Sequence, residues 1–139
     1  MKRLLSGNFI RYQLPAILVA LAIFVLSSIP DLHIPSLHWK FKDKWAHLIA
    51  YTVLGFLTCR ALYFQRKYYA LQVHPAIWAF LLVTLYGISD EFHQAFVPGR
   101  TPDVFDVAAD CVGAILGLVF FLLARFFQKK PAEILDNSE

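Results

Sequence analysis

The sequence predicts an all-α integral membrane protein, a compact bundle of four transmembrane helices. Hydrophobic residues make up 58% of the 139 residues, charged residues only 17%, and the mean hydropathy is +0.54. A soluble domain of this size could not hide several long apolar segments in one core, whereas a bilayer accepts them as helices, which satisfy their own backbone hydrogen bonds. No segment is long enough to be a linker, so a single domain over 1–139 is expected.

Apolar runs in the sequence mark the four expected helices. They are Leu14 to Ile29, Trp45 to Cys59, Ala76 to Ser89 and Cys111 to Ala124. Each run is shorter than the roughly 20 residues that cross a bilayer, so polar residues at the ends of the runs must lie within membrane depth. We therefore expect helices near 13–30, 43–63, 75–94 and 103–127.

The first run could instead belong to a secretory signal, because Lys2 and Arg3 precede it and Ser27 lies near a potential cleavage point. Leu26 would then occupy a position that prefers a small side chain, and the run is long for a signal. We expect a retained first helix.

The distribution of Lys and Arg predicts the topology. Nine of the thirteen lie at the amino end, in the connection after 59 or in the tail after 124. By the positive-inside rule, both termini are expected in the cytoplasm. The net charge of +3 is explained in this way and requires no nucleic-acid partner. Membrane lipids are the expected surroundings, and oligomerisation is left open.

Polar residues gather at the ends of the last three expected helices. The connections before the second helix and after the third must lie on the same side of the membrane in either orientation. At about 100° per residue, these side chains fall on a narrow sector of each helix. The expected ligand-binding residues are Asp43, Lys44, His47, Tyr51, Asp90, Glu91, Gln94, Arg100, Asp103, Asp106 and Asp110.

Each polar sector continues along its helix as small residues, which predicts close helix packing. The residues are Gly55, Gly87, Gly113 and Gly117. The last two form a GxxxG pair on the face that the aspartates already mark.

The cluster is acidic, with six carboxylates against Lys44 and Arg100. Like charges in a low dielectric cannot all stay ionised without help, so protonation, a divalent cation or a cationic ligand is expected. The alternative is a structural polar plug in which Arg100 bridges Asp103 or Asp106 and Lys44 pairs with Glu91.

Two segments carry a further resemblance. They read DKWAHLIAYTVLGF from Asp43 to Phe56 and SDEFHQAFVPGRTPDVFDVAADCVGAILG from Ser89 to Gly117. Their order and spacing resemble the VanZ-like family of small bacterial membrane proteins. The matching positions are Asp43, Lys44 and His47, then Glu91 and Gln94, then Pro98, Gly99 and Arg100, then Asp106, Gly113 and Gly117. The family commonly has Asn where this chain has Asp110.

The resemblance implies a multi-pass protein of the bacterial cytoplasmic (inner) membrane, associated with resistance to glycopeptide antibiotics, teicoplanin in the founding member. The leading hypothesis is that the cluster forms a vestibule at the outer face that binds an envelope component, such as a cell-wall precursor, a lipid headgroup or a glycopeptide.

Two other functions remain open. An enzyme would use His47 as acid and Glu91 or Asp106 as base, with Asp90, Glu91, Asp106 and Asp110 as oxygen ligands suited to Mg²⁺ or Ca²⁺. Proton-coupled transport would use the excess carboxylates as a relay.

Overall fold

A computed structural model of the chain describes residues 7–30 and 42–136. All regular structure in these residues is helical, as the sequence predicts. A π-helical turn, η1 (Phe9–Gln13), leads into α1 (Leu14–Ser27). It is followed by α2 (Lys42–Phe64), a short α3 (Tyr69–Val73), α4 (Pro75–Gln94) and α5 (Val104–Asp136).

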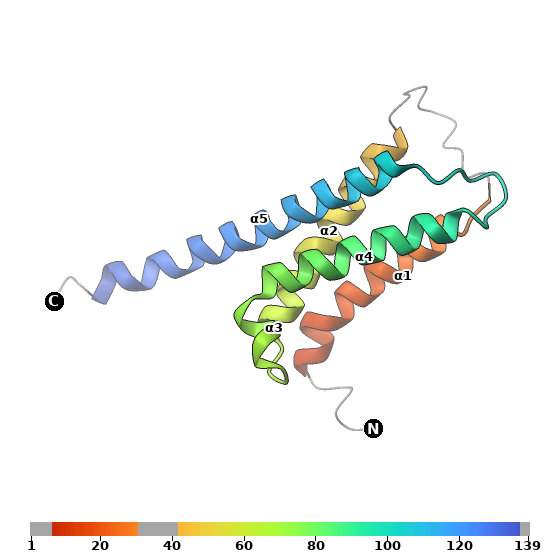
Figure 1. The fold of residues 1–139 in the computed structure, drawn as a ribbon. Helices are drawn as coiled ribbons and strands as arrows, with labels where there is room; N and C mark the ends of the chain where they lie inside the picture. Colours follow the sequence, from red (N-terminus) through yellow and green to blue (C-terminus); the bar gives the residue numbers. More distant parts are fainter. Residues whose placement is uncertain (1–6, 31–41, 137–139) are drawn as a thin grey trace.

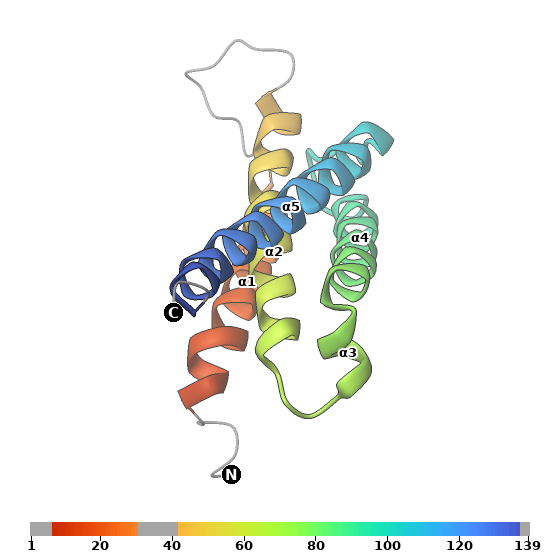
Figure 2. The same ribbon diagram turned by 90° about the vertical axis from the view of Figure 1, so that its left-hand side faces the viewer.

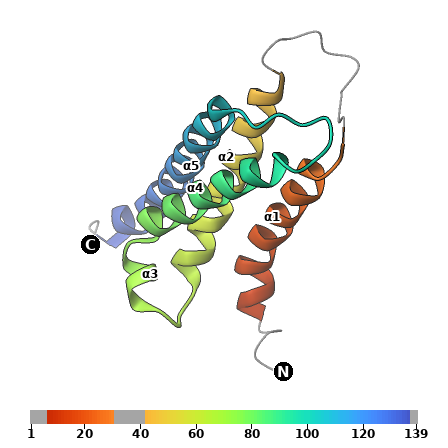
Figure 3. The same ribbon diagram turned by 45° about the vertical axis from the view of Figure 1, so that its right-hand side comes forward.

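The helices α2 and α5 form the centre of the bundle. They pack along each other, and α4 contacts both of them (Figures 1 and 2). On the other side, α1 packs against α2 and, less extensively, against α4, and within the described residues it does not pack on α5 (Figure 3). The start of α2, the end of α4 and the start of α5 therefore meet at one end of the bundle, where α1 also ends.

Three segments are long and apolar enough to cross a membrane: Phe9–Ser27, Asp43–Phe64 and Val104–Gln128. Only 6% of the most apolar part of Phe9–Ser27 is buried inside the structure, so this helix presents apolar side chains outward along nearly its whole length. An apolar surface of this extent suits lipid rather than water. The helix α4, which ends in Asp90, Glu91, His93 and Gln94, is not among the three segments.

Helix boundaries differ from the expected ranges in three places. Helix α1 ends at Ser27, where the side chains of Ser27 and Ser28 bond to the carbonyl of Phe24, shortly before Pro30. Helix α5 runs past its expected end at 127 to Asp136, through Pro131, a residue that ordinarily interrupts a helix. The short α3 was not expected, because the sequence predicted only a connection with basic residues between the second and third helices.

Glycines allow α2 and α5 to approach closely. A Cβ atom on Gly55 would lie 2.8 Å from the carbonyl oxygen of Ala114. A Cβ on Gly117 would collide with the carbonyl oxygen of Thr52 and lie 2.6 Å from the amide nitrogen of Phe56. Because both obstacles are backbone, neither can move aside without separating the two helices.

The two remaining glycines of the expected packing set lie in the same region. Gly113 faces the backbone of α2 at Leu48 and Thr52. On α4, a Cβ on Gly87 would lie 2.7 Å from Oδ2 of Asp110 and 3.2 Å from the Tyr51 ring. Gly87 thus lets α4 lie directly against a buried carboxylate of α5.

Replacing Gly117 with alanine is expected to destabilise the fold by about 1–3 kcal/mol, because the added methyl overpacks a contact between two backbones. The measurement is the free energy of unfolding in detergent micelles, followed by circular dichroism. Gly7→Ala is the matched control, since nothing lies within 4 Å of a Cβ at that helical position. Equal stability of the two variants would show that α2 and α5 do not depend on this close approach.

Candidate functional site

Buried polar side chains are concentrated at the end of the bundle where α2 and α5 begin and α4 ends. Six of them are at most 8% exposed: Ser27, Asp90, Glu91, Gln94, Asp106 and Asp110. They lie next to polar residues of the first turns of α2. We define the acidic site as Lys44, His47, Glu91, Asp103, Asp106 and Asp110.

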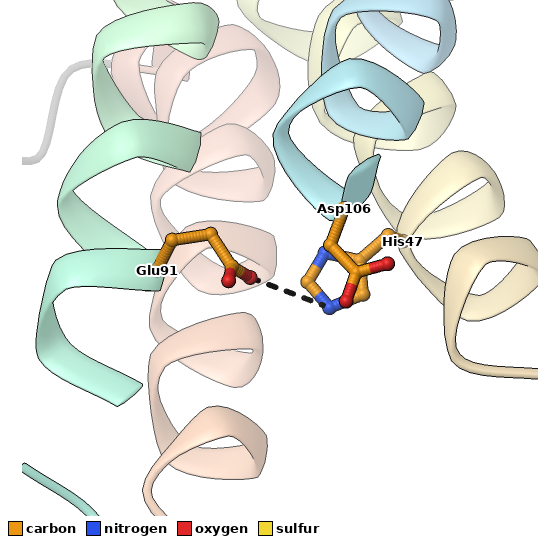
Figure 4. A group of neighbouring side chains, drawn as sticks. All are labelled: His47, Glu91 and Asp106. Atoms are coloured by element: carbon orange, nitrogen blue, oxygen red, sulfur yellow. Dashed lines mark ion pairs between the residues drawn. The ribbon is translucent and has the colours of Figure 1, made fainter. Parts of the chain in front are cut away.

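His47 of α2 lies at the centre of the acidic site. Its Nδ1 lies 2.9 Å from Oδ1 of Asp110, a residue of α5 that is completely buried. A neutral imidazole held in this way carries the proton on Nδ1 and leaves Nε2 as an acceptor. Nε2 faces Glu91 of α4, with Oε1 at 3.9 Å, as Figure 4 shows.

Three buried oxygen atoms around His47 have no hydrogen-bond partner among the described residues. They are Oε1 of Glu91, Oδ2 of Asp110 and the hydroxyl oxygen of Tyr51. The Tyr51 ring stacks against the His47 ring, with centroids 6.0 Å apart and planes inclined by 8°. Unpaired buried carboxylate oxygens are costly, so this arrangement calls for a proton, water or a cation.

Lys44 neutralises the outer edge of the acidic site. Its Nζ donates to Oδ2 of Asp103 at 2.5 Å and to Oδ1 of Asp106 at 3.0 Å. Asp103 also accepts a hydrogen bond from the backbone N–H of Phe105, at 2.9 Å, at the start of α5. The Lys44 ammonium, and then the Phe105 N–H, hold the pKa of the Asp103 carboxyl below its usual range. The polar-plug hypothesis expected Lys44 to pair with Glu91, and this pair is not formed.

Glu91 is instead tied to the start of α5 by its other oxygen. Its Oε2 accepts a hydrogen bond from the backbone N–H of Asp103 at 2.9 Å. This contact fixes the Glu91 side chain while Oε1 stays free of hydrogen bonds. With Lys44 shared by Asp103 and Asp106, His47 is the one basic side chain in the described part of the chain that pairs with Glu91 and Asp110.

Asp90 and Gln94 face α1 rather than the acidic site. Ser27 Oγ donates to Oδ1 of Asp90 at 2.6 Å, and Gln94 Nε2 donates to Oδ2 at 3.1 Å. Asp90 thus has a partner on each oxygen. The sequence placed Asp90 and Glu91 in one cluster, but adjacent helix positions diverge by about 100°, so the two carboxylates serve different contacts.

The polar-plug hypothesis expected Arg100 to bridge Asp103 or Asp106, but Arg100 has other partners. Gly99, with φ of 77°, forms the turn before it, and the guanidinium donates to the carbonyls of Leu26 at 3.1 Å and Ile29 at 3.3 Å. The last carbonyls of a helix lack intrahelical donors and attract a cation. Arg100 consequently closes the end of α1.

A cavity of about 260 Å³ lies between α1, α2 and α4 and adjoins the acidic site at His47. One part of its wall is apolar, formed by Ile23, Leu26, Ala46 and Ala50. The other part is polar, formed by Ser27, Asp43, His47, Tyr51, Asp90, Gln94 and Arg100. Asp43, which is exposed on the first turn of α2, joins the expected residues here.

The contribution of α1 to this cavity was missed from the sequence. Its polar signal is Ser27, a hydroxyl at the end of an otherwise apolar helix. Serine is common near helix ends, so it did not identify a site by itself.

One set of residues could hold a divalent cation. One ligand atom each from His47, Glu91 and Asp106 lie within 4.8 Å of one another. Asp110 would orient His47 from behind, as carboxylates do for metal-bound histidines. The free Oε1 of Glu91 fits this role, although Asp106 must be shared with Lys44. The set mixes nitrogen and oxygen, which suits Mn²⁺ or Zn²⁺ as well as Mg²⁺.

The expected ligand set was different, because it contained Asp90 and Asp110 and no histidine. The structure directs Asp90 to Ser27 and Asp110 to His47. An all-oxygen site of the kind Ca²⁺ prefers is therefore not assembled by the described residues.

These helices, with apolar outer surfaces and a buried polar cluster at one end, define a small helical membrane protein. The model of the VanZ/LLP1 family matches residues 6–125, and the chain belongs to that family. Neither a curated protein nor a solved structure matches the chain.

Replacing Ser27 with alanine is expected to destabilise the fold by about 1–3 kcal/mol, because Oδ1 of the buried Asp90 loses its donor. Thermal unfolding in detergent measures the effect. Ser89→Ala is the control, since Ser89 is exposed on α4 and bonds only locally, to the carbonyl of Tyr86. A Ser27→Ala variant as stable as the control would mean that α1 is not held through Asp90.

Proposed function

We propose that the chain is a multi-pass protein of the bacterial cytoplasmic membrane that binds an amphipathic envelope component in the cavity between α1, α2 and α4. The observation that carries this proposal is the two-part wall of that cavity, apolar at Ile23, Leu26 and Ala50 and polar at Asp90 and Arg100. A molecule with a hydrocarbon chain and a charged headgroup matches both parts.

Four membrane crossings are supported by the direction of α4. The start of α4 follows α3 at the far end of the bundle, and its last turns reach the acidic site, where Glu91 approaches His47 of α2 (Figure 1). If α2 crosses the membrane, α4 must return across it. Helix α4 tolerates its polar last turns because neighbouring helices bury them.

The orientation follows from the basic residues. The end opposite the acidic site carries Arg11, Arg60, Arg66, Lys67 and Arg125. The positive-inside rule places this end, and both termini, in the cytoplasm. The acidic site and the cavity would then face the outside, at the depth of lipid headgroups and lipid-linked cell-wall precursors.

The charged residues that line the cavity indicate which chemical groups the ligand carries. Arg100 is the single Lys or Arg among the described residues that line the cavity, and it suits a phosphate or carboxylate. Asp43 and Asp90 line the same cavity and suit an amine or hydroxyl donor. A lipid-linked precursor combines these groups with a long hydrocarbon chain. Resistance to teicoplanin-type glycopeptides would follow if such binding changed the precursor available to the antibiotic.

Filling the cavity tests this proposal. Ala46→Leu is expected to weaken binding of a lipid-linked cell-wall precursor by about tenfold or more, since the added side chain occupies the apolar part of the cavity. Binding is measured by fluorescence anisotropy in detergent, and teicoplanin susceptibility of cells expressing each variant is measured in parallel.

The control is Ala108→Leu, the same change at an exposed position of α5 outside the cavity. Equal binding by the two variants would refute the cavity as the binding site. Unchanged susceptibility with weakened binding would retain the binding function and reject the link to resistance.

A second function is favoured by one specific observation, the approach of His47, Glu91 and Asp106 beside the cavity. A divalent cation held there would polarise a phosphoryl or carbonyl oxygen of a lipid-linked or peptide substrate. Glu91 would bind the cation through the oxygen that lacks a hydrogen bond, and Asp110 would fix the His47 ring.

Glu91→Gln is expected to lower the affinity for Mn²⁺ by about 100-fold, and Asp110→Asn by about tenfold, because the first removes a ligand charge and the second only its support. Equilibrium dialysis of the purified protein with Mn²⁺ provides the measurement. Asp43→Asn removes a carboxylate from the same end without touching the three ligands and serves as control. Equal affinity in Glu91→Gln and Asp43→Asn would exclude the metal site.

A further inference from the structure

The opposite end of the bundle contains two cavities that the proposed function does not use. One of about 200 Å³ is lined by residues of η1, α2 and α5. Another of about 360 Å³ is lined in addition by the connection to α3, and the two share Tyr12, Phe64 and Arg125. These cavities lie where η1 and α5 both pack on α2 but, within the described residues, not on each other.

Arginine side chains in these cavities lie against aromatic rings. The guanidinium carbon of Arg60 is 4.8 Å from the centroid of Tyr12, and that of Arg125 is 4.7 Å from the centroid of Tyr63. Tyr12 stacks on Phe64, with centroids 4.3 Å apart. The rings hold the guanidinium groups in the cavity walls, whereas basic side chains at a membrane surface ordinarily extend toward water.

The arginines in these walls have no acidic partner among the described residues. Arg11, Arg60, Arg66 and Arg125 line the two cavities, and none of the described lining residues is acidic. Arg60 donates to the carbonyl of Arg11, and Arg125 donates to Tyr63 and Gln128, so their described hydrogen-bond partners are all neutral. The buried Nε of Arg125 has no hydrogen-bond partner among the described residues.

The cavities also have an apolar side suited to hydrocarbon. Phe56 of α2 and Phe121 of α5 line the smaller cavity next to Arg60 and Arg125. Both phenylalanines lie nearer the middle of the candidate spans than the two arginines do. An anionic group at the arginines could therefore be continuous with an apolar chain directed toward the membrane interior.

We propose that this end of the bundle is a binding site for the headgroup of an anionic phospholipid. The phosphate accepts hydrogen bonds from Arg60 and Arg125, whose planar guanidinium groups suit phosphate oxygens. One acyl chain lies against Phe56 and Phe121 in the cavity between η1, α2 and α5. The lipid fills the cavity that η1 and α5 leave over α2 and links these two segments.

The experiment measures the affinity of the full chain in detergent for phosphatidylglycerol and for phosphatidylcholine by native mass spectrometry. Wild type is expected to retain phosphatidylglycerol preferentially. Arg60→Gln and Arg125→Gln are each expected to weaken this binding by about fivefold, and the double variant by on the order of 30-fold. Arg125→Lys, which keeps the charge, is expected to retain part of the preference.

Lys67→Gln is the matched control, because it removes one positive charge at the same end from an exposed residue that lines neither cavity. Its binding is expected to stay within about twofold of wild type. Inorganic phosphate is added as a competitor, and displacement of the lipid by millimolar phosphate would assign the site to the free anion.

Three further results would overturn the proposal. Equal binding of the two lipids by wild type would remove the headgroup preference, and this measurement does not depend on any variant folding. Undiminished lipid binding in the double variant would exclude Arg60 and Arg125. An equal loss in Lys67→Gln would reduce the effect to net charge. None of these outcomes bears on the cavity beside the acidic site, which is tested by other residues and another ligand.

Discussion

The close approach of α2 and α5 is the constraint on which the acidic site depends. Gly55 and Gly117 bring the two backbones together, and this spacing sets His47 of α2 against Asp110 of α5. A wider separation would open the 2.9 Å contact between these side chains. Gly87 does the same for α4, since it allows Asp110 to be buried beneath that helix. The burial of the carboxylates therefore depends on the glycines, because the absent side chains leave the space that the carboxylates occupy between the helices.

Much of the fold was predictable because membrane helices can be recognised in a sequence as long apolar runs. Helices α2, α4 and α5 begin near the expected residues, and α2 and α4 also end near them, at Phe64 and Gln94. The glycine stripes were also predictable, because a spacing of four residues puts Gly113 and Gly117 on one helix face. The short α3 and the extension of α5 to Asp136 were not, since neither carries an apolar run.

The site was predictable as a gathering of residues and unpredictable as a set of partners. The alternating direction of successive membrane helices and the helical period bring the polar ends together. They do not determine which carboxylate pairs with which basic side chain. Lys44 could have reached Glu91 and instead binds Asp103 and Asp106. Arg100 could have joined the aspartates and instead binds carbonyls of α1, a helix whose apolar sequence gave little sign of involvement. Such choices depend on tilts and side-chain reach that spacing alone does not contain.

The attachment of α1 gives Arg100 a further significance. The C-terminal half of α1 and the residues just after it are held to their neighbours by a few hydrogen bonds. Ser27 bonds to Asp90, Tyr86 to the carbonyl of Ala20, and Arg100 to the carbonyls of Leu26 and Ile29. A phosphate drawn to Arg100 would compete with those carbonyls for the same guanidinium. If a ligand phosphate took the N–H donors that bind these carbonyls, occupancy of the cavity would weaken the attachment of α1 to its neighbours.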